Sequence, residues 1–291
     1  MKNSAQRQLS DLVPAERIVI EDLLRALLEC ENRGLEATET QLVGLSGVGR
    51  QATAKQLAVA LELGLLEALA SGVWGLTERG RAEAIRVMRA HRLTETKLAR
   101  ETGLAAERWH YVAHAKEHRM TQSEVDALAD RLGNPRFDPH GDPIPTREGH
   151  FPAPEDLPLL DWAPGEPGVI AHIEDEPAEL FARLAAMGLS AGLRFVSQRE
   201  SSGVGLFVEG RTLVIPNDLI ALLRVRPLHR EETGPVAGAI RLSDLNHGEL
   251  GEVVTLLPSC VGTERSRLLD LGFVPGSQIE RVLDSPLHGP V

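Results

Sequence analysis

The histidines of this chain recur at a spacing that suits a metal site. Four possible metal ligands lie close together, with the histidines at every fourth position: His110, His114, Glu117 and His118. At 3.6 residues per turn, the three imidazoles share one stripe of a helix, and the carboxylate lies beside it. His91 and Glu95 place two more ligands one turn apart on the preceding helical segment. Two packed helices that present imidazoles and carboxylates can enclose a first-row transition-metal ion.

The alternative is a solvated helix face with scattered histidines, which is the usual position of a lone histidine. Five of the ten histidines lie between positions 91 and 140, and this concentration favours metal binding. Asp22 lies among apolar residues of the first helical segment and can supply a further carboxylate. The sequence has no nucleophile motif, phosphate-binding loop or dinucleotide fingerprint, so we predict that the protein is not an enzyme.

Length and composition are those of a soluble protein with two or three domains. The 291 residues are 42% hydrophobic and 25% charged. No apolar run reaches the ~18 residues of a membrane span, and residues 1–13 are too polar for a signal peptide. Cys30 and Cys260 lie far apart without metal-type spacing, as expected for reduced thiols. We therefore expect a cytoplasmic protein that does not associate with a membrane.

The net charge of −11 would by itself argue against DNA binding, but the charge is unevenly distributed. Residues 41–100 hold nine basic and five acidic side chains, whereas residues 121–291 hold 14 basic and 26 acidic ones. A modest basic surplus therefore coincides with the segment whose pattern predicts a DNA reader.

The N-terminal segment has the element order of a winged helix-turn-helix, which we assign to residues 1–78. Apolar periodicity predicts helices over 15–33, 39–45 and 51–62. Turn residues at 46–49 separate the last two helices, and two short strands follow over 65–76. We expect the inner face of the third helix to be formed by Ala54, Leu57, Ala58 and Leu61.

The start of that third helix would enter the major groove of DNA, as the recognition helix of a winged helix does. The residues expected to contact DNA are Gly49, Arg50, Gln51, Thr53, Lys55 and Gln56. For each of them taken singly, the alternative is a surface polar residue without a partner. For the helix as a whole, DNA binding is the favoured interpretation.

Helical patterns over 79–101, 105–120 and 122–132 predict a metal-binding and dimerisation domain, residues 79–150. Thr121 and Glu124 have the spacing of a capping box at the start of the last helix. Positions 135–168 then hold nine of the 18 prolines, which block helix and sheet interiors. We interpret residues 151–167 as a linker.

Short β-type runs after Gly168, with one helix at 177–187, predict a small barrel over residues 168–230. The segment 183–195 recurs at 267–279, including two glycines four positions apart that suit a helix end and a tight turn. A second barrel is therefore predicted over residues 235–291. We expect it to be incomplete, because the sequence stops before the counterparts of the first barrel's last strands.

In their order and spacing, these motifs resemble the metal-dependent repressors of the diphtheria-toxin-repressor and manganese-transport-regulator family (DtxR/MntR). The resemblance covers about residues 15–230. It rests on Glu21-Asp22, the winged helix, MetArgAlaHisArgLeuThrGlu at 88–95, the histidine motif at 110–118 and AspProHisGlyAspProIlePro at 138–145. Residues 235–291 resemble a further copy of a FeoA-like, SH3-like barrel. The implied fold has a mainly α N-terminal half, the winged helix-turn-helix and the helical dimerisation domain, followed by small all-β SH3-like barrels.

The resemblance also implies two sets of metal ligands. The primary site would be formed by Asp22, His91, His114, Glu117 and His118. An ancillary site would draw on Glu95, His110, Asp138, His140 and Asp175.

Three positions depart from the family pattern. The chain has His114 where members have glutamate or cysteine, Asp138 where many have cysteine, and Arg25 where manganese-type members use glutamate. The primary set therefore lacks a sulfur ligand. A set of imidazoles and carboxylates suits Mn²⁺ or Fe²⁺ and would bind Zn²⁺ more tightly in vitro.

The function implied by the resemblance is that of a metal-dependent transcriptional repressor of manganese or iron homeostasis genes. Its partners would be a double-stranded DNA operator and a second copy of the chain in a homodimer, with no small organic ligand. Three alternatives stay open at this point. They are a winged-helix repressor that senses an organic ligand, a metalloenzyme whose cluster activates water, and an accessory module of ferrous-iron transport built on the barrels.

Overall fold

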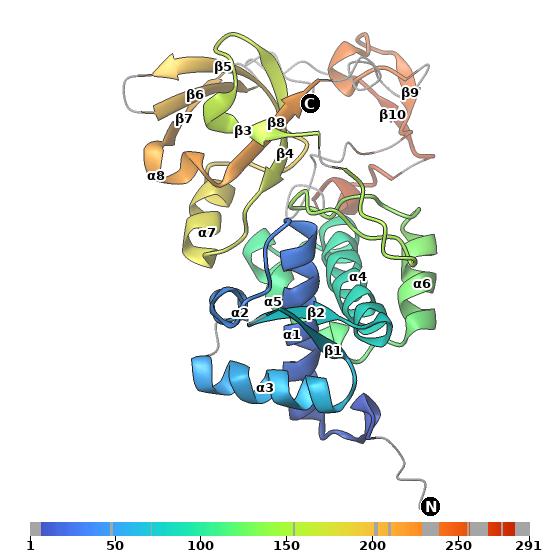
Figure 1. Cartoon of the computed structure of the whole chain (residues 1–291). Coiled ribbons are helices and arrows are strands. Elements are labelled where there is room, and N and C mark those ends of the chain that lie inside the picture. The colour runs from blue at the N-terminus through green and yellow to red at the C-terminus, as the bar shows by residue number, and fades with distance from the viewer. Residues whose placement is uncertain are drawn as a thin grey trace, which may run out of the picture. The chain divides into compact units, whose positions relative to one another are not determined.

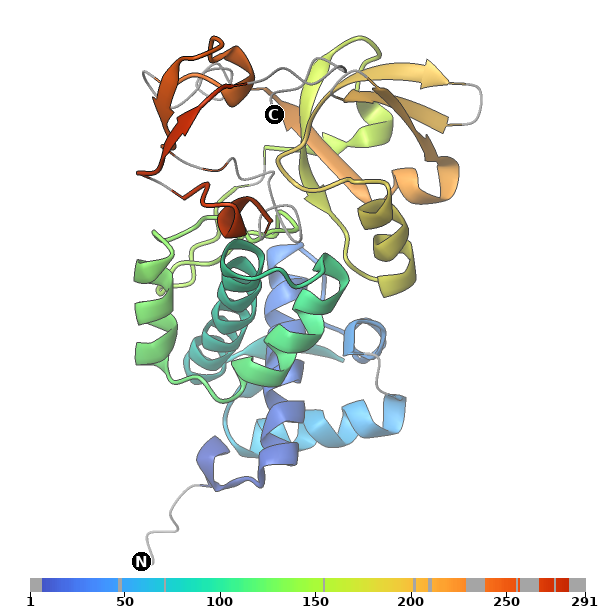
Figure 2. The same ribbon diagram turned by 180° about the vertical axis from the view of Figure 1, so that it is seen from behind.

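The computed structural model describes residues 7–46, 49–70, 72–153, 155–200, 203–208, 211–228, 239–254, 256, 267–274 and 276–282. The chain divides into two compact units, whose elements are shown in Figure 1 and, from behind, in Figure 2. The first unit comprises residues 1–96, 110–138 and 143–153, and the second comprises 97–109, 139–142 and 154–291. Across the described ranges, no helix combines the length and apolar composition that a membrane span requires.

The first unit begins with a short 3-10 helix, Leu9–Asp11, and the predicted winged helix-turn-helix. Its elements are α1 (Pro14–Asn32), α2 (Glu39–Ser46), α3 (Arg50–Glu62), β1 (Leu66–Ala70) and β2 (Val73–Leu76). In α1 the apolar stripe predicted from the sequence is buried, with Leu23, Leu24 and Leu27 fully inaccessible. This stripe packs against α2 and α3, so α1 is the core helix of the winged helix-turn-helix. The antiparallel pair β1–β2 forms the wing.

The predicted inner face of α3 is wrong for three of its four residues. Leu57 is buried, but Ala54, Ala58 and Leu61 are exposed. The buried stripe is instead formed by Thr53, Gln56, Leu57 and Ala60. Thr53 adapts to burial because its hydroxyl donates to the carbonyl oxygen of Gly49 one turn earlier. The contact with α1 and α2 therefore rotates α3 away from the face that apolarity alone would select.

Three further helices follow: α4 (Glu78–Glu101), α5 (Trp109–Glu117) and α6 (Gln122–Arg131). The helix predicted over 105–120 is shorter than expected, because Ala106–Arg108 forms a 3-10 turn and α5 ends at Glu117. His118 thus lies in the turn that follows, where the N–H of Arg119 bonds back to the carbonyl of Lys116. The capping box of α6 is confirmed, since Thr121 and Glu124 exchange side-chain and backbone hydrogen bonds.

Parts of the Pro-rich segment pack against the cores of the two units. Ile144 is 4% exposed in a core with α4 and α6, and Arg89 donates to the carbonyl oxygen of Pro145 at 2.6 Å. In the second unit, Leu157–Pro158 forms strand β3, and Leu159 is buried in the barrel core. The assignment of residues 151–167 to a linker is therefore wrong from residue 157 onward, because a strand and a buried leucine anchor that part.

The second unit contains a six-stranded antiparallel sheet in the order β3-β8-β4-β5-β6-β7. The strands after β3 are β4 (Pro167–Ile173), β5 (Arg194–Glu200), β6 (Gly203–Val208), β7 (Arg211–Pro216) and β8 (Leu223–Pro227). Helix α7 (Ala178–Ala186) and the single turn α8 (Asn217–Ile220) complete it. Phe181 of α7 joins the core beneath the strands together with Ile170 and Leu206. This is the small SH3-like barrel that the sequence predicts.

The sequence repeat is also a structural repeat. Gly188 and Gly272 each end a helical segment with positive φ, and Gly192 and Gly276 share the same backbone conformation. The N–H of Gly192 donates to the carbonyl of Ile170, and the N–H of Gly276 donates to that of Val253, both at 2.8 Å. Strands β9 (Leu250–Glu252) and β10 (Gln278–Glu280) pair antiparallel in the second copy. The prediction that this copy lacks its last strands falls outside the described residues.

Candidate metal centre

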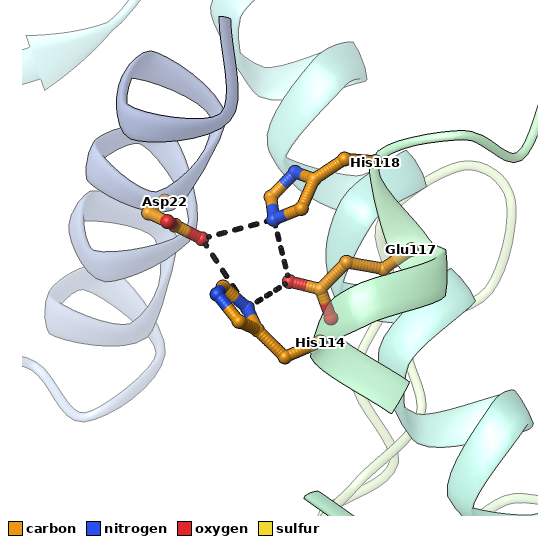
Figure 3. A group of neighbouring side chains, drawn as sticks. All are labelled: Asp22, His114, Glu117 and His118. Carbon is orange, nitrogen blue, oxygen red and sulfur yellow. Dashed lines mark hydrogen bonds and ion pairs between the residues drawn. The ribbon is translucent and has the colours of Figure 1, made fainter. Parts of the chain in front are cut away.

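A cluster of four potential metal ligands lies between α1 and the end of α5 (Figure 3). Asp22 projects from α1, His114 and Glu117 from α5, and His118 from the turn that follows. One atom of each residue can be chosen so that all lie within 4.8 Å of one another. The end of α5 and the turn after it bring His114 and His118 together, and the packing of α1 adds Asp22. We call these four residues the primary group.

The distances within the primary group suit a bound ion. His118 Nε2 lies 3.2 Å from Glu117 Oε1 and 3.4 Å from Asp22 Oδ1. His114 Nδ1 lies 3.1 Å from the same glutamate oxygen and 3.9 Å from Asp22 Oδ1. Four ligands at bond lengths of about 2.1 Å are held roughly 3.0–3.5 Å apart. The protein has therefore brought the four close to the spacing that coordination requires.

Two buried atoms of the primary group make no hydrogen bond: Asp22 Oδ1 and His118 Nε2. Buried polar atoms are almost always satisfied, so such atoms call for an ion or water. Glu117 is fully buried, and His118 is 5% exposed. Two imidazoles and two carboxylates without sulfur fit a hard to borderline divalent ion. The residues present thus fit a transition-metal ion.

Electrostatics in the cluster favour opposite charges on its two kinds of ligand. Burial alone would raise the pKa of Glu117, but the neighbouring imidazoles of His114, His118 and His91 hold that pKa well below its usual range. Burial likewise lowers the pKa of His118, but the neighbouring carboxylates of Asp22, Glu117 and Glu21 raise it to about 11. The Glu117 carboxylate therefore stays ionised, and without a metal the His118 ring is an imidazolium.

A second group of three ligands lies between α4 and α5, formed by His91, Glu95 and His110. His91 Nε2 is 3.1 Å and His110 Nδ1 is 3.7 Å from Glu95 Oε1. The sequence predicts His91 as a ligand of the primary site, and the structure places it beside Glu95 and His110. The i, i+4 spacing on α4 pairs His91 with Glu95, and only its Nδ1 turns toward the primary group, where it contacts Glu117. Glu117 therefore touches both groups.

The remaining ancillary ligands are divided between the units. Asp138 is buried in the first unit, at 7% exposure. In the second unit, His140 Nδ1 lies 3.8 Å from Asp175 Oδ2, and the His140 ring contacts the rings of Trp109 and Phe181. The ancillary role of these residues stays a prediction.

Glu21 contacts the primary group, a role that the sequence pattern does not predict. It is 1% exposed on α1, its Oε2 is 2.6 Å from His118 Nδ1, and its Oε1 is 2.7 Å from Arg86 Nη2. The available signal was an acidic residue on the apolar, inward side of an amphipathic helix, where a carboxylate needs buried partners.

The predicted DNA-contacting residues divide by exposure. Gly49, Arg50, Gln51 and Lys55 are exposed at the start of α3. Thr53 is fully buried, and Gln56 is 8% exposed. These two assignments are corrected, because both side chains face α1 and α2 rather than solvent.

Comparisons with known proteins bear on the family of this chain. The model of the iron dependent repressor, metal binding and dimerisation domain matches residues 77–146, and that of the FeoA domain matches residues 240–291. The iron-dependent repressor IdeR of Mycobacterium tuberculosis (strain ATCC 25618 / H37Rv) is 30% identical over 177 residues, covering 56% of this chain and 76% of that protein. The chain belongs to the family of iron-dependent repressors.

Solved structures extend this family relationship to the fold. A manganese-dependent transcriptional repressor in complex with manganese is 27% identical, with a TM-score of 0.62, over 72% of this chain and 100% of its own. IdeR of T. acidophilum is 29% identical, with a TM-score of 0.55, over 71% and 97%. These members of the repressor family are transcriptional regulators rather than enzymes. These structural matches confirm the predicted fold class, a helical N-terminal half followed by a β-rich region.

Proposed function

We propose that this chain is a metal-activated repressor that binds operator DNA as a homodimer and controls genes of manganese or iron homeostasis. The observation that carries the proposal is the position of Asp22. It lies on α1, which packs against both helices of the helix-turn-helix, whereas its three partners come from α5 and the turn after it. One ion bound by the primary group would therefore connect the DNA reader to the dimerisation helices.

A bound ion would supply positive charge that holds the carboxylates and imidazoles of two elements in one arrangement. Without the ion, nothing bridges the carboxylates of Asp22 on α1 and Glu117 on α5. The contact between α1 and α5 then has fewer attractive interactions. The apo protein must then lose conformational freedom when it binds DNA, and metal binding removes that loss beforehand. Metal and DNA therefore favour the same conformation, which is the thermodynamic meaning of co-repression.

The dimer and the operator follow from the type of reader. The matched family model describes a dimerisation domain. Two winged helices in a symmetric dimer present their recognition helices to successive major grooves, about 34 Å apart. Arg50, Gln51 and Lys55 on the exposed start of α3 are suited to base edges and phosphates. We infer a two-fold symmetric operator.

For the metal, we propose Mn²⁺ or Fe²⁺ in the primary group and a second ion of the same kind at His91, Glu95 and His110. Carboxylates and imidazoles without thiolate suit these ions, and Zn²⁺ would bind more tightly by intrinsic affinity. The solved structures of a manganese-dependent repressor and of IdeR both match this fold. A direct comparison of the ions on this chain is therefore the informative measurement.

The test of the function is a gel shift with the DNA upstream of the protein's own gene. Protein dialysed against a chelator should bind this DNA weakly, and added Mn²⁺ or Fe²⁺ should restore a specific complex. Equal binding with and without metal would overturn metal activation and favour a repressor that senses an organic ligand. A footprint at a symmetric site would locate the operator.

Metal binding by the primary group is expected to tighten as the pH rises. The pKa of His118 is about 11, so at neutral pH its Nε2 carries a proton that the ion must displace. Each displaced proton makes the apparent affinity rise about tenfold per pH unit below that pKa. Competition titrations with Mn²⁺ between about pH 6 and pH 8 would measure the slope. An affinity independent of pH would contradict this expectation.

Lys55→Ala is expected to weaken operator binding by about 1–3 kcal/mol if Lys55 contacts a base edge. A phosphate contact would instead weaken binding to all sequences and lower the salt dependence. Thr53→Val is the control, because Thr53 is buried and should change stability rather than DNA affinity. Fluorescence anisotropy with operator and random duplexes at two salt concentrations separates these outcomes. If Lys55→Ala changes neither affinity nor salt dependence, the contact is absent.

A further inference from the structure

A polar network lies behind His118, on the side of the ring that faces away from the primary group. Glu21 Oε2 is 2.6 Å from His118 Nδ1. In this contact the ring N–H donates and the carboxylate oxygen accepts, so Nδ1 carries the proton. The lone pair available to a metal must then be on Nε2, which is the atom that lies beside Asp22 and Glu117.

Two arginines hold this network in place. Arg86 Nη2 donates to Glu21 Oε1 at 2.7 Å, and Arg86 Nη1 donates to the carbonyl oxygen of Met120 at 2.8 Å. Arg17 Nη2 donates to the carbonyl oxygen of His118 at 2.5 Å. Both carbonyl groups lie in the turn that follows α5, so the guanidinium groups hold this turn in place. The ring and the backbone of His118 are thus both positioned from α1 and α4.

A small pocket gives solvent access to the network. Its volume is about 240 Å³, and Arg17, Glu21, Arg86 and His118 are among the residues that line it. Glu83 lies at the same pocket and accepts from Arg86 Nε at 2.9 Å, but it makes no contact with His118. The pocket therefore offers a route for a small solute to the position of the Glu21 carboxylate, and Glu83 offers a matched control.

We propose that Glu21 is a positioning residue for metal binding, which orients the His118 ring and selects Nε2 as its coordinating atom, with Arg86 and Arg17 as anchors. This inference rests on the proposed metal-dependent function. Carboxylates behind metal-binding histidines set the ring orientation and basicity, and their loss lowers metal affinity about 10- to 100-fold. Here the same residue also links α1 to α5 independently of Asp22, so Glu21 prepares the site before an ion arrives.

The experiment compares Glu21→Gln with Glu83→Gln in the full chain. Glu21→Gln should weaken Mn²⁺ and Zn²⁺ binding by about 10- to 100-fold in chelator competition. Glu83→Gln also removes a carboxylate partner of Arg86 but leaves the contact of His118 with Glu21 intact. It should weaken metal binding by no more than about fivefold. In Glu21→Ala, added formate should enter the pocket and restore part of the lost affinity. A purely structural role would show no rescue, and unchanged affinity in Glu21→Gln would overturn the proposal.

A metal-free measurement separates this inference from the proposed function. In the apo wild-type chain, nitrogen-15 NMR should detect a slowly exchanging Nδ1–H proton on His118, because Glu21 shields it. That signal should persist in Glu83→Gln and vanish in Glu21→Gln. Its absence from the wild type would overturn the role of Glu21 even if no variant folds. Its presence in a wild-type protein that binds no metal would instead overturn the proposed function.

Discussion

Glu117→Gln is expected to reduce metal affinity at least about a hundredfold and to abolish metal-dependent operator binding. Glu117 Oε1 lies 3.1 Å from His114 Nδ1 and 3.2 Å from His118 Nε2, and the other carboxylate oxygen contacts His91. Replacing this buried charge therefore affects both groups of ligands. The glutamine keeps the volume of the side chain, so the helices should remain packed. The positive charge on His91 and His118 loses one of its compensating carboxylates.

The measurement is a competition titration with Mn²⁺ and Zn²⁺, followed by a gel shift at saturating metal. Glu107→Gln is the control, because it makes the same chemical change at an exposed residue of a 3-10 turn. Circular dichroism should show equal helix content in the wild type and in both variants. Wild-type metal affinity in Glu117→Gln would remove the primary group from consideration as the metal site.

Gly80→Ala is expected to lower the free energy of unfolding by about 3 kcal/mol. A Cβ atom at position 80 would lie 1.9 Å from the carbonyl oxygen of Leu65, far inside van der Waals contact. That carbonyl cannot yield easily, because it accepts a hydrogen bond from the N–H of Thr77 at 3.1 Å. Alanine would therefore push the first turn of α4 away from the start of the wing. The angle between the reader and the dimerisation helices would change with it.

Gly44→Ala is the matched control in α2. A Cβ atom there meets nothing within 4 Å, and alanine favours a helix by about 1 kcal/mol over glycine. The two variants make the same chemical change in a helix and should shift stability in opposite directions. Urea unfolding followed by far-ultraviolet circular dichroism reports the helical unit. Equal stability of the two variants would show that α4 and the wing are not in close contact.

Much of the first unit could be predicted from local sequence patterns. Leucine spacing in α1, the turn residues between β1 and β2, and the Thr121–Glu124 capping box depend on neighbours within a few positions. The i, i+3 spacing of His114 and Glu117 on one side of α5 also follows from helix geometry. The glycine repeat predicted two similar turns, and their φ values agree in both copies.

Contacts between elements could not be predicted in the same way. Thr53 and Gln56 were expected to face DNA, because polar side chains usually face solvent, but the packing of α3 on α1 and α2 buries them. His91 was assigned to the primary site, whereas its pairing with Glu95 and its approach to His110 depend on how α4 meets α5. Strand β3 in the Pro-rich segment exists only because β8 pairs with it.

The pattern of residues indicates the candidate metal ligands and a winged helix-turn-helix that precedes most of them. The grouping of those ligands, and the position of Glu21 behind His118, follow from the packing of the elements. The difference comes from the range of the interactions. Helix periodicity and capping act over a few residues, whereas a metal site is assembled by the packing of α1, α4 and α5, whose residues are far apart in the chain.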